Sequence, residues 1–331
     1  MEKELPLVSI VSGYYNRVNF VDESISSLIN QTYQNIEILI FDDCSKDGTY
    51  EKLKAFEQID SRLRVIRHEK NKGFVRGMID AVAIAKGEFI AVHGSGDISL
   101  QDRVSEQVAA LINDPILGAV GCHYENVKID PANPGSHSQS KIVRRDFSGN
   151  AQQTLTKENI FTHGEVMFRK STYEQAGGYR ELFKFAQDRD LWCRMSMISD
   201  FYIVPKQLYK RFSLPDGASV VVEKRVVQKV LAEFAVQNHE LRLAGKPDLI
   251  KIYGNQALIF FKYTDRFIRN IYPVIIGGYM ENNNKPNPIV LGIVKQVTSR
   301  YFLNRFSIML YLLYFVLPEN VGKFIGKKRN W

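Results

Sequence analysis

Four aspartates stand at positions where carboxylates can do chemistry. Asp42 and Asp43 follow the apolar run IEILIF, residues 36–41, which is typical of a buried strand. An ionised carboxylate at a strand end accepts directed hydrogen bonds, so this pair suits a ribose hydroxyl or a nucleobase N–H. An N-cap for the following helix explains the same pair equally well from spacing alone.

The second pair, Asp188 and Asp190, lies near the start of a helical pattern that runs from Phe183 to Met197. Residues two apart on a helix point in different directions, so we expect only one of them to be catalytic. A carboxylate in a partly dry pocket can take the proton of an attacking hydroxyl, which makes a general base one interpretation. Charge stabilisation of the helix N-terminus is the other.

Cations and histidines offer further candidates. Arg76 and Lys72 stand beside glycines in NKGFVRG, where a close backbone approach and a positive charge suit a diphosphate; a solvated loop is the alternative. His93 and His163 each precede a glycine, although lone histidines are more often structural than catalytic. The sequence contains no zinc-binding histidine motif, phosphate-binding loop or Ser-His-Asp arrangement.

The elements that position these residues alternate between strands and helices. Apolar or β-branched runs predict strands at residues 7–12, 36–41, 63–67 and 88–92, with helices between them. This rhythm predicts an α/β fold with a mostly parallel sheet, whose ligands lie at the C-terminal ends of the strands. Residues 130–149 are rich in Pro, Asn, Ser and Gly, and we expect them to form a mobile surface loop covering the site.

The C-terminal region differs in pattern and in charge. The pattern becomes helical after about Val220, which predicts one domain over residues 1–220 and a helical, basic region over residues 221–331. Residues 205–331 contain 20 Lys and Arg against 8 Asp and Glu, which suits a polyanion or an anionic membrane face. The apolar stretch 307–317 is shorter than the ~20 residues that span a bilayer, so it lies on a membrane or packs on the domain.

Composition narrows the class of protein. Hydrophobic residues at 45% and charged residues at 24% are typical of a globular chain. Cys44, Cys122 and Cys193 are widely spaced and odd in number, which favours a reducing compartment over a disulfide framework. The charged N-terminus does not resemble a secretory signal. No nucleic-acid-binding motif accompanies the basic half, so we expect no nucleic-acid partner.

Several segments together resemble the large family-2 inverting glycosyltransferases of GT-A fold, many of which build bacterial surface polysaccharides such as O-antigen or capsule. The resemblance extends from about Leu7 to Arg211. VSIVSGYYNR and SSLINQTYQNIEILIFDDCSKDGT are similar to the family's opening strand, loop, helix and acidic turn. The segments that follow the family's order and spacing further on are NKGF, AKGEFIAVHGSGDISLQDR, HGEVMFRKSTYEQAGGYRE and FAQDRDLWCRM.

The resemblance implies roles for particular residues. Asp43 would contact the base of the donor nucleotide, with Gly13 and Tyr15 lining the base pocket. Asp188 would be the general base for the acceptor hydroxyl. The remaining implied contacts are Arg76 and Asp97 at the donor nucleotide, and His163, Glu165 and Trp192 in the acceptor pocket.

One turn departs from the family's pattern. Members usually carry an Asp-x-Asp-Asp turn after the fourth strand, whose carboxylates hold a divalent metal on the donor diphosphate. The aligned residues are here Gly94, Ser95, Gly96 and Asp97. A histidine ligand that often follows the base helix is also missing, since no histidine lies between His163 and His239.

Three interpretations of this departure are open. In the first, the transferase is metal-independent, and the diphosphate is neutralised by the amides of residues 94–96 with side chains drawn from Arg76, His93, Lys210 and Arg211. In the second, Asp97 and the donor phosphates bind Mg²⁺ or Mn²⁺ weakly. In the third, catalysis is lost and a nucleotide-sugar-binding or scaffold protein remains, which the intact motif around Asp188 disfavours.

The resemblance finally implies partners and a location. We expect an enzyme, a glycosyltransferase that moves a sugar from a nucleotide-sugar donor to a lipid-linked or oligosaccharide acceptor. The basic, apolar C-terminus would keep it at the cytoplasmic membrane surface, as a cytoplasmic protein peripheral to the inner face of the cell membrane.

Overall fold

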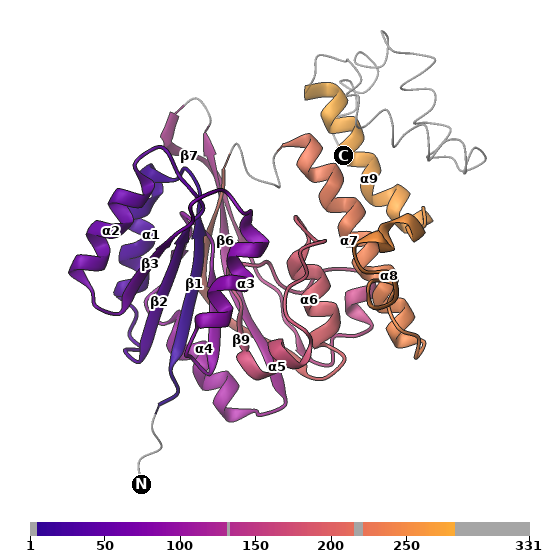
Figure 1. The fold of residues 1–331 in the computed structure, drawn as a ribbon, viewed down its shortest axis with the longest axis horizontal. Coiled ribbons are helices and arrows are strands. Elements are labelled where there is room, and N and C mark those ends of the chain that lie inside the picture. Colours follow the sequence, from indigo (N-terminus) through magenta and orange to yellow (C-terminus); the bar gives the residue numbers. More distant parts are fainter. Residues whose placement is uncertain (1–4, 131–132, 215–220, 282–331) are drawn as a thin grey trace. The chain divides into compact units, whose positions relative to one another are not determined.

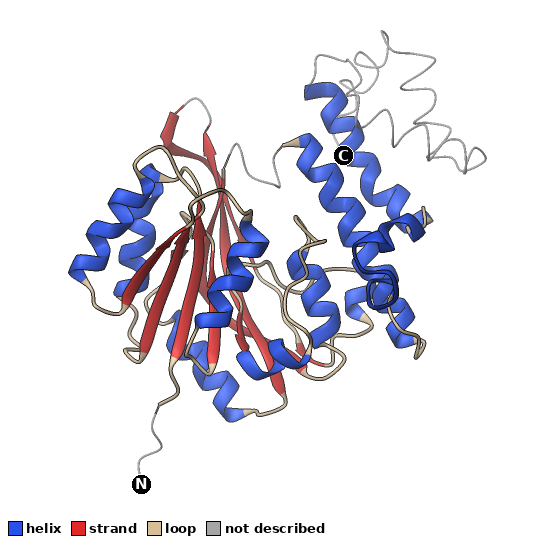
Figure 2. Ribbon diagram, in the orientation of Figure 1, coloured by secondary structure: helices blue, strands red, loops and turns tan. Residues whose placement is uncertain are grey.

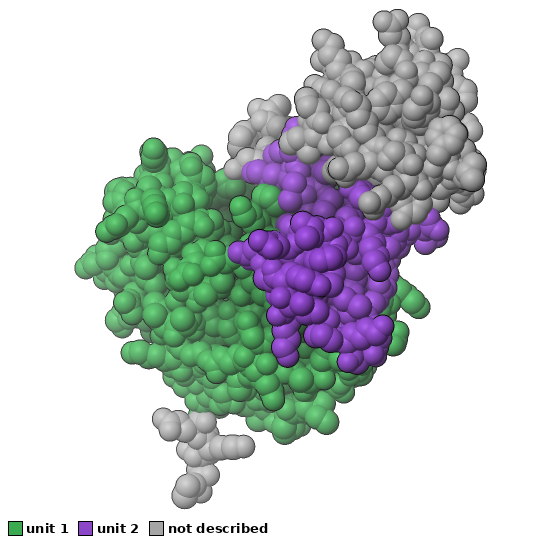
Figure 3. All heavy atoms as spheres, turned by 45° about the vertical axis from the view of Figure 1, so that its right-hand side comes forward, with its two compact units in different colours: residues 1–214 green, residues 215–331 purple. Residues whose placement is uncertain are grey.

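The computed structural model describes residues 5–130, 133–214 and 221–281 (Figure 1). The chain forms two compact units, residues 1–214 and residues 215–331, which are coloured separately in Figure 3. The first unit combines a sheet with helices, whereas the described part of the second unit is helical (Figure 2).

Four parallel strands form the part of the sheet that the sequence predicts. They lie in the order β3-β2-β1-β4, and β1 is buried at each of its residues. Such short apolar runs are stable as strands because helices cover both of their faces. The observed bounds differ from the predicted ones by at most two residues: β1 (Val8–Tyr14), β2 (Ile36–Asp42), β3 (Leu63–Arg67) and β4 (Phe89–His93).

Two hydrophobic cores lie on opposite faces of this sheet, because successive side chains of a strand point to opposite sides. Ile38 and Ile40 belong to one core, and Leu39 and Phe41 belong to the other. The first core is completed by α1 (Val21–Ile29), α2 (Thr49–Ile59) and α4 (Arg103–Asn113). The second is completed by α3 (Phe74–Ile84), α5 (Lys170–Gln175) and α6 (Gln187–Met195).

Beyond β4 the sheet becomes mixed. The short strand β9 pairs antiparallel with both β4 and β6, and β6 then runs parallel to β10. The expectation of parallel strands is therefore correct up to β4 and does not extend across β9. The remaining elements of this unit are η1 (Val18–Phe20), β5 (Ile98–Ser99), β6 (Leu117–Asp130), β7 (Asn133–Val143), β8 (Ser148–Gly149), η2 (Thr154–Thr156), β9 (Met167–Arg169) and β10 (Asp200–Ser213).

The predicted loop over residues 130–149 is wrong for most of its length. β7 pairs antiparallel with β6, from Tyr124 opposite Val143 to Asp130 opposite Asn133, and β8 pairs with β10. The prediction of a loop was based on the absence of apolar periodicity. A strand pair at the edge of a sheet is held by backbone hydrogen bonds and can form without such a pattern. Its side chains therefore do not have to alternate between core and solvent.

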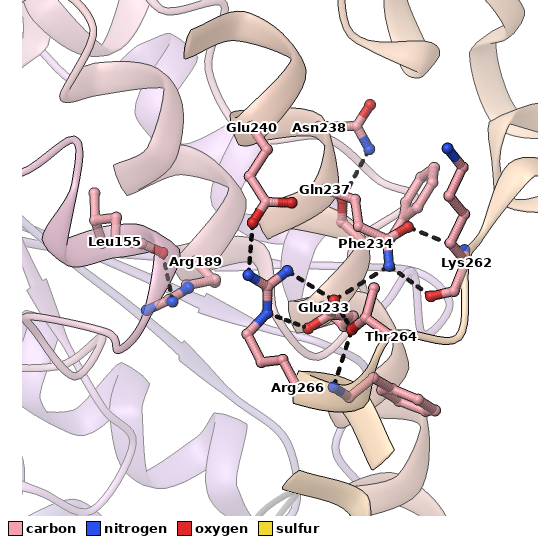
Figure 4. A network of polar contacts seen from close by, with 11 residues as sticks. Leu155, Arg189, Glu233, Phe234, Gln237, Asn238, Glu240, Lys262, Thr264 and Arg266 are labelled. Atoms are coloured by element: carbon pink, nitrogen blue, oxygen red, sulfur yellow. Dashed lines mark hydrogen bonds and ion pairs between the residues drawn. The ribbon is translucent and has the colours of Figure 1, made fainter. Parts of the chain in front are cut away.

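The second unit is built on α7 (Val222–Leu243) and α9 (Asp265–Glu281), with α8 (Leu249–Tyr253) and η3 (Gly254–Phe260) between them. A buried carboxylate joins the two long helices, since Glu233 of α7 accepts hydrogen bonds from Thr264 and Arg266 at 2.7 Å each (Figure 4). The predicted helical character is confirmed over these residues. The apolar stretch 307–317 lies outside the described residues.

None of the helices in the described part of the chain is both long enough and apolar enough to cross a membrane.

Candidate active site

The carboxylate of Asp43 is fixed at the C-terminal ends of β2 and β3. Its Oδ1 accepts a hydrogen bond from the backbone of Lys72 and lies 2.8 Å from Nδ1 of His68, while its Oδ2 accepts one from Gly73. Two acceptor positions of Oδ1 are thus occupied, whereas Oδ2 keeps capacity for a ligand N–H. His68 was not predicted as a site residue, although the pairing of adjacent parallel strands brings their ends together.

The loop after β1 lies beside Asp43, whose backbone N–H donates to the carbonyl of Tyr14. Asn16 is held in the left-handed region at φ 51°, and its side chain accepts a hydrogen bond from Lys46. This leaves the Tyr15 side chain 47% exposed, so its ring is accessible to a ligand. The predicted base-pocket residues Tyr15 and Asp43 therefore come from neighbouring strand ends.

Gly13 contributes close packing to this corner. A Cβ at that position would lie 2.1 Å from the ring of Phe41, and a Cβ at Gly77 of α3 would lie 2.2 Å from the same ring. The His68 ring stacks on the Phe41 ring, with centroids 5.4 Å apart. The two glycines thus allow Phe41 to support the histidine that holds Asp43.

Asp97 is turned inward, toward β10. Its Oδ2 accepts a hydrogen bond from the Tyr209 hydroxyl at 2.7 Å, and its Oδ1 accepts one from the Phe212 backbone at 2.8 Å. Burial raises the pKa of Asp97 to about 6, against the opposing effect of these hydrogen bonds and of Arg211. The carboxylate therefore ties the turn to β10.

The two glycines of this turn have different neighbours. A Cβ at Gly94 would lie 2.2 Å from Oδ2 of Asp97, so a larger residue there would displace the carboxylate. Gly96 has φ +92°, which side-chain-bearing residues rarely adopt, and a Cβ there would lie 3.0 Å from the Phe20 side chain. Neither position therefore accommodates a side chain in this conformation.

One amide of the turn is engaged within the protein. The Gly94 N–H donates to the Tyr209 hydroxyl at 2.9 Å. A diphosphate contact through this amide would require that hydrogen bond to break. Ser95 stays a predicted contact, since it is partly exposed at the tip of the turn.

The donor atoms of this turn do not fit a divalent metal site of the family's kind. Mg²⁺ and Mn²⁺ prefer several oxygen ligands, whereas the turn offers one carboxylate, both of whose oxygens already accept hydrogen bonds. No group of three or more His, Cys, Asp or Glu side chains suited to a metal occurs among the described residues. We therefore derive no catalytic step through a metal.

His93 lies in the core, away from solvent. Its Nε2 is 3.0 Å from the Ser24 hydroxyl, and its Nδ1 is 3.2 Å from the Ser99 hydroxyl. Burial lowers the pKa of His93 to about 3, so the ring is neutral at physiological pH. A neutral, enclosed imidazole with both nitrogens engaged is poorly suited to the predicted role at the diphosphate.

Of the predicted cations, Arg211 acts electrostatically on the carboxylate of Asp97 in the turn. Lys210 precedes it on β10, half-exposed and 3.7 Å from Glu125. Arg76 is exposed on α3 and forms ion pairs with Asp80 and Glu181. Arg211 thus acts on the turn, whereas Arg76 is engaged in ion pairs on the surface of α3.

The two aspartates of α6 differ in their surroundings, as the sequence predicts. Asp190 is fully buried and receives hydrogen bonds from Arg194 at 2.7 and 3.1 Å. Asp188 is half-buried, and its Oδ2 accepts a hydrogen bond from the Asn159 side chain at 3.0 Å. Asp190 is therefore committed to an internal ion pair, whereas Asp188 keeps an accessible carboxylate.

A histidine–tyrosine pair stands near Asp188. Nε2 of His163 lies 2.8 Å from the Tyr179 hydroxyl, and Asp188 acts electrostatically on both groups. Burial lowers the pKa of His163 to about 4 and raises that of Tyr179 well above its usual value, so both are neutral near pH 7. His163 is thus brought to the predicted base, and Tyr179, unpredicted, joins it.

The other two predicted acceptor residues are enclosed. Trp192 has no exposed surface and packs against Phe161 and Phe168, so its predicted contact with an acceptor is not available from this position. Glu165 is 2% exposed and accepts a hydrogen bond from the Thr162 backbone at 2.7 Å. Burial raises the pKa of Glu165 to about 7.

The fold is that of a GT-A glycosyltransferase, with one carboxylate at the strand ends and a second on a helix. The chain belongs to glycosyl transferase family 2, whose model matches residues 9–177. It is accordingly an enzyme of sugar transfer, as predicted.

Similar proteins agree with this assignment. An uncharacterized glycosyltransferase of Haemophilus influenzae is 26% identical over 83% of this chain and 86% of its own length. WfgD of Escherichia coli, a UDP-Glc:α-D-GlcNAc-diphosphoundecaprenol β-1,3-glucosyltransferase, is 36% identical over 33% of this chain and 43% of its own length. The fold is also that of the mannosyltransferase PcManGT from Pyrobaculum calidifontis, solved with GDP-Man and Mn²⁺. The TM-score is 0.55 at 15% identity, over 98% of this chain and 88% of that one.

Proposed function

We propose that this enzyme transfers a sugar from a nucleotide-sugar donor to a lipid-linked saccharide with inversion at the anomeric carbon. Asp188 takes the proton of the acceptor hydroxyl, whose oxygen attacks the anomeric carbon while the nucleoside diphosphate leaves with the electron pair of the broken bond. The observation that carries this proposal is the contrast on α6, where Asp190 is enclosed in an ion pair and Asp188 is half-buried and accessible.

Asn159 and the pair His163–Tyr179 support this role for Asp188. The Asn159 amide holds one carboxylate oxygen at 3.0 Å, which orients the other oxygen. A fixed orientation matters because proton transfer requires hydrogen-bond reach to the reacting hydroxyl. The neutral His163 is partly exposed and can contact an acceptor hydroxyl, while Tyr179 holds its ring from the buried side.

For the donor, we propose that Asp43 binds the nucleobase through the free position of Oδ2, with the Tyr15 ring packing on the base. Two proteins of similar fold were solved with nucleotide sugars bound. PcManGT was solved with GDP-Man, and TarS of S. aureus was solved with UDP-GlcNAc. TarS has a TM-score of 0.52 to this chain at 16% identity. Arg211, with Lys210 beside it, stabilises the charge of the departing diphosphate.

For the acceptor, we propose a saccharide on a lipid diphosphate, because WfgD is named for an acceptor of this kind. Residues 1–220 would carry the transfer reaction, and the basic residues 221–331 would hold the enzyme at the cytoplasmic face of the membrane. A soluble domain that works on a membrane-held substrate gains effective concentration from such an attachment.

A panel of nucleotide sugars with a lipid-linked acceptor tests the proposal. We expect product from one donor, and NMR of the new linkage should show the anomeric configuration opposite to that of the donor. Retention of configuration would contradict the mechanism. Nucleotide binding without product from any donor or acceptor would contradict the transferase and favour a scaffold.

A further inference from the structure

Exposed apolar side chains gather in the segment formed by α8 and η3 of the second unit. Ile252 is 53% exposed, Tyr253 44%, Ile259 76% and Phe260 38%. Single exposed apolar residues are normal on protein surfaces, but four large ones within nine positions are a reason to look for a partner.

We refer to these four residues as the patch. The Tyr253 and Phe260 rings lie 4.4 Å apart between centroids, which joins the end of α8 to the end of η3. Ile252 and Ile259 directly precede the two aromatic residues in the sequence and are exposed as well. Each of the two elements therefore ends in one exposed aliphatic and one exposed aromatic residue.

The patch stands on a segment that α7 holds at both ends. The backbone of Leu249 donates to the Asn238 side chain at 2.7 Å, and Gln237 pairs with the backbone N–H and carbonyl of Lys262 at 3.0 and 2.7 Å. Asp248 caps α8 by accepting from the Lys251 backbone at 2.7 Å. The exposed residues are thus presented by an anchored structure.

The charge around the patch is positive. Lys246, Lys251 and Lys262 are exposed at its borders, and the sequence has no Asp or Glu from Leu249 to Thr264. Apolar and aromatic residues bordered by lysines are the composition that binds the interface of an anionic bilayer, where rings lie among the headgroups and ammonium groups meet the phosphates.

We propose that the α8–η3 segment is a membrane-docking surface that binds an anionic lipid bilayer. Ile259 and Phe260 enter the boundary between headgroups and acyl chains, and the three lysines contact headgroup phosphates. This proposal rests on the proposed function, because a lipid-linked acceptor requires the enzyme to work at a membrane.

Vesicle binding by the full chain tests this surface, with Ile259→Glu as the variant. Ile59 of α2 is 74% exposed in the first unit, so Ile59→Glu is a control matched in residue type and exposure. With vesicles containing phosphatidylglycerol, we expect Ile259→Glu to weaken partitioning at least tenfold and Ile59→Glu to leave it unchanged. Equal partitioning of Ile259→Glu and the parent chain would overturn the proposal.

Insertion of the patch can be measured separately. Tyr253→Trp places a fluorophore in it, and vesicles of brominated lipid should quench its emission beyond that of the parent chain. Retained vesicle binding without added quenching would overturn the proposal. A lower oligomeric mass for Ile259→Glu with unchanged vesicle binding would overturn it too, by assigning the patch to contact between copies of the chain.

Donor hydrolysis without vesicles separates this inference from the proposed function. The parent chain and Ile259→Glu should hydrolyse the donor at the same rate, because the patch belongs to the second unit and the residues of the proposed site belong to the first. Hydrolysis by both with no difference in vesicle binding would overturn the docking surface alone. Vesicle binding that depends on Ile259, with no turnover of any donor, would support the surface while contradicting the transferase.

Discussion

The carboxylates of Asp97 and Asp188 occupy opposite situations, although the family pattern marks both as site residues. Both oxygens of Asp97 accept hydrogen bonds from β10, and the group is 8% exposed. Asp188 receives one hydrogen bond from Asn159 and is half-buried. The comparison shows that a carboxylate at a motif position can react only when one of its oxygens stays accessible to a ligand.

The largest expected effect is on turnover. Asp188→Asn removes the proposed base while keeping an amide of the same shape, so kcat should fall by about 10²–10⁴-fold. Steady-state kinetics with a fixed donor measures this, and the denaturation midpoint should stay unchanged. A variant that retains more than a tenth of the parent kcat would refute the role of Asp188.

The same substitution at Asp190, two residues further along α6, should lower the stability of the fold. Asp190→Asn removes one charge of a buried ion pair and leaves Arg194 uncompensated, which costs about 3–5 kcal/mol of unfolding free energy. Urea denaturation measures the loss. If Asp190→Asn instead left stability intact and abolished turnover, the assignment of the two aspartates would have to be exchanged.

Glu165 makes stability depend on pH. Burial raises its pKa from 4.5 to about 7 in the folded chain, so the folded state holds a proton that the unfolded state loses first. The protonated group's contribution is complete below about pH 4.5 and is lost as the pH rises toward 7. It amounts to something on the order of 3 kcal/mol, at 1.36 kcal/mol per pKa unit.

Glu165→Gln should abolish that contribution. The stability of the parent chain relative to this variant is expected to fall between pH 5 and pH 8, measured by denaturant unfolding at each pH. Glu174→Gln, at a carboxylate whose side chain is 61% exposed, serves as the control and should show no such trend. A flat difference for Glu165→Gln would show that its carboxyl ionises normally in the fold.

Gly94→Ala probes the inward carboxylate of Asp97. The added Cβ would meet Oδ2 of Asp97 at 2.2 Å, and we expect a loss of about 1–3 kcal/mol in unfolding free energy. Gly277→Ala, where nothing lies within 4 Å, is the control. Combining Gly94→Ala with Asp97→Ala should cost less than the sum of the single changes, and strict additivity would argue against the contact.

The smallest effect concerns the orientation of Asp188. Asn159→Ala removes the amide that holds one of its oxygens, so kcat should fall roughly tenfold while the KM for the donor stays constant. The exposed Asn255 supplies a control alanine variant. An effect on donor KM alone would place Asn159 at the nucleotide instead.

The first four strands were predictable because each is a short apolar run between helical patterns, which local sequence displays. β7 was not, since its pairing with β6 leaves no periodic signal, and β9 enters the sheet only through contacts far along the chain. Parallel strands within βαβ units are thus easier to infer than the mixed half of the sheet.

Asp43 and Asp188 were predictable as candidates because each carries a motif signal itself, and their roles stay predictions. Their partners were not predictable, because Asn159 lies 29 residues from Asp188, His68 lies 25 from Asp43, and Tyr209 lies 112 from Asp97. Local sequence also suggested that the Gly94–Gly96 amides were available for a diphosphate. Only the packing of Tyr209 against the turn shows where the Gly94 amide donates.

The contrast between Asp97 and Asp188 is tested most directly by measuring the rate of sugar transfer. The parent chain, Asp97→Asn and Asp188→Asn are each measured with Mn²⁺ and with excess EDTA. We predict that the parent and Asp97→Asn keep transfer in both conditions to within about tenfold, whereas Asp188→Asn loses it in both. Transfer that requires Mn²⁺ and disappears with Asp97→Asn, while Asp188→Asn stays active, would contradict the account.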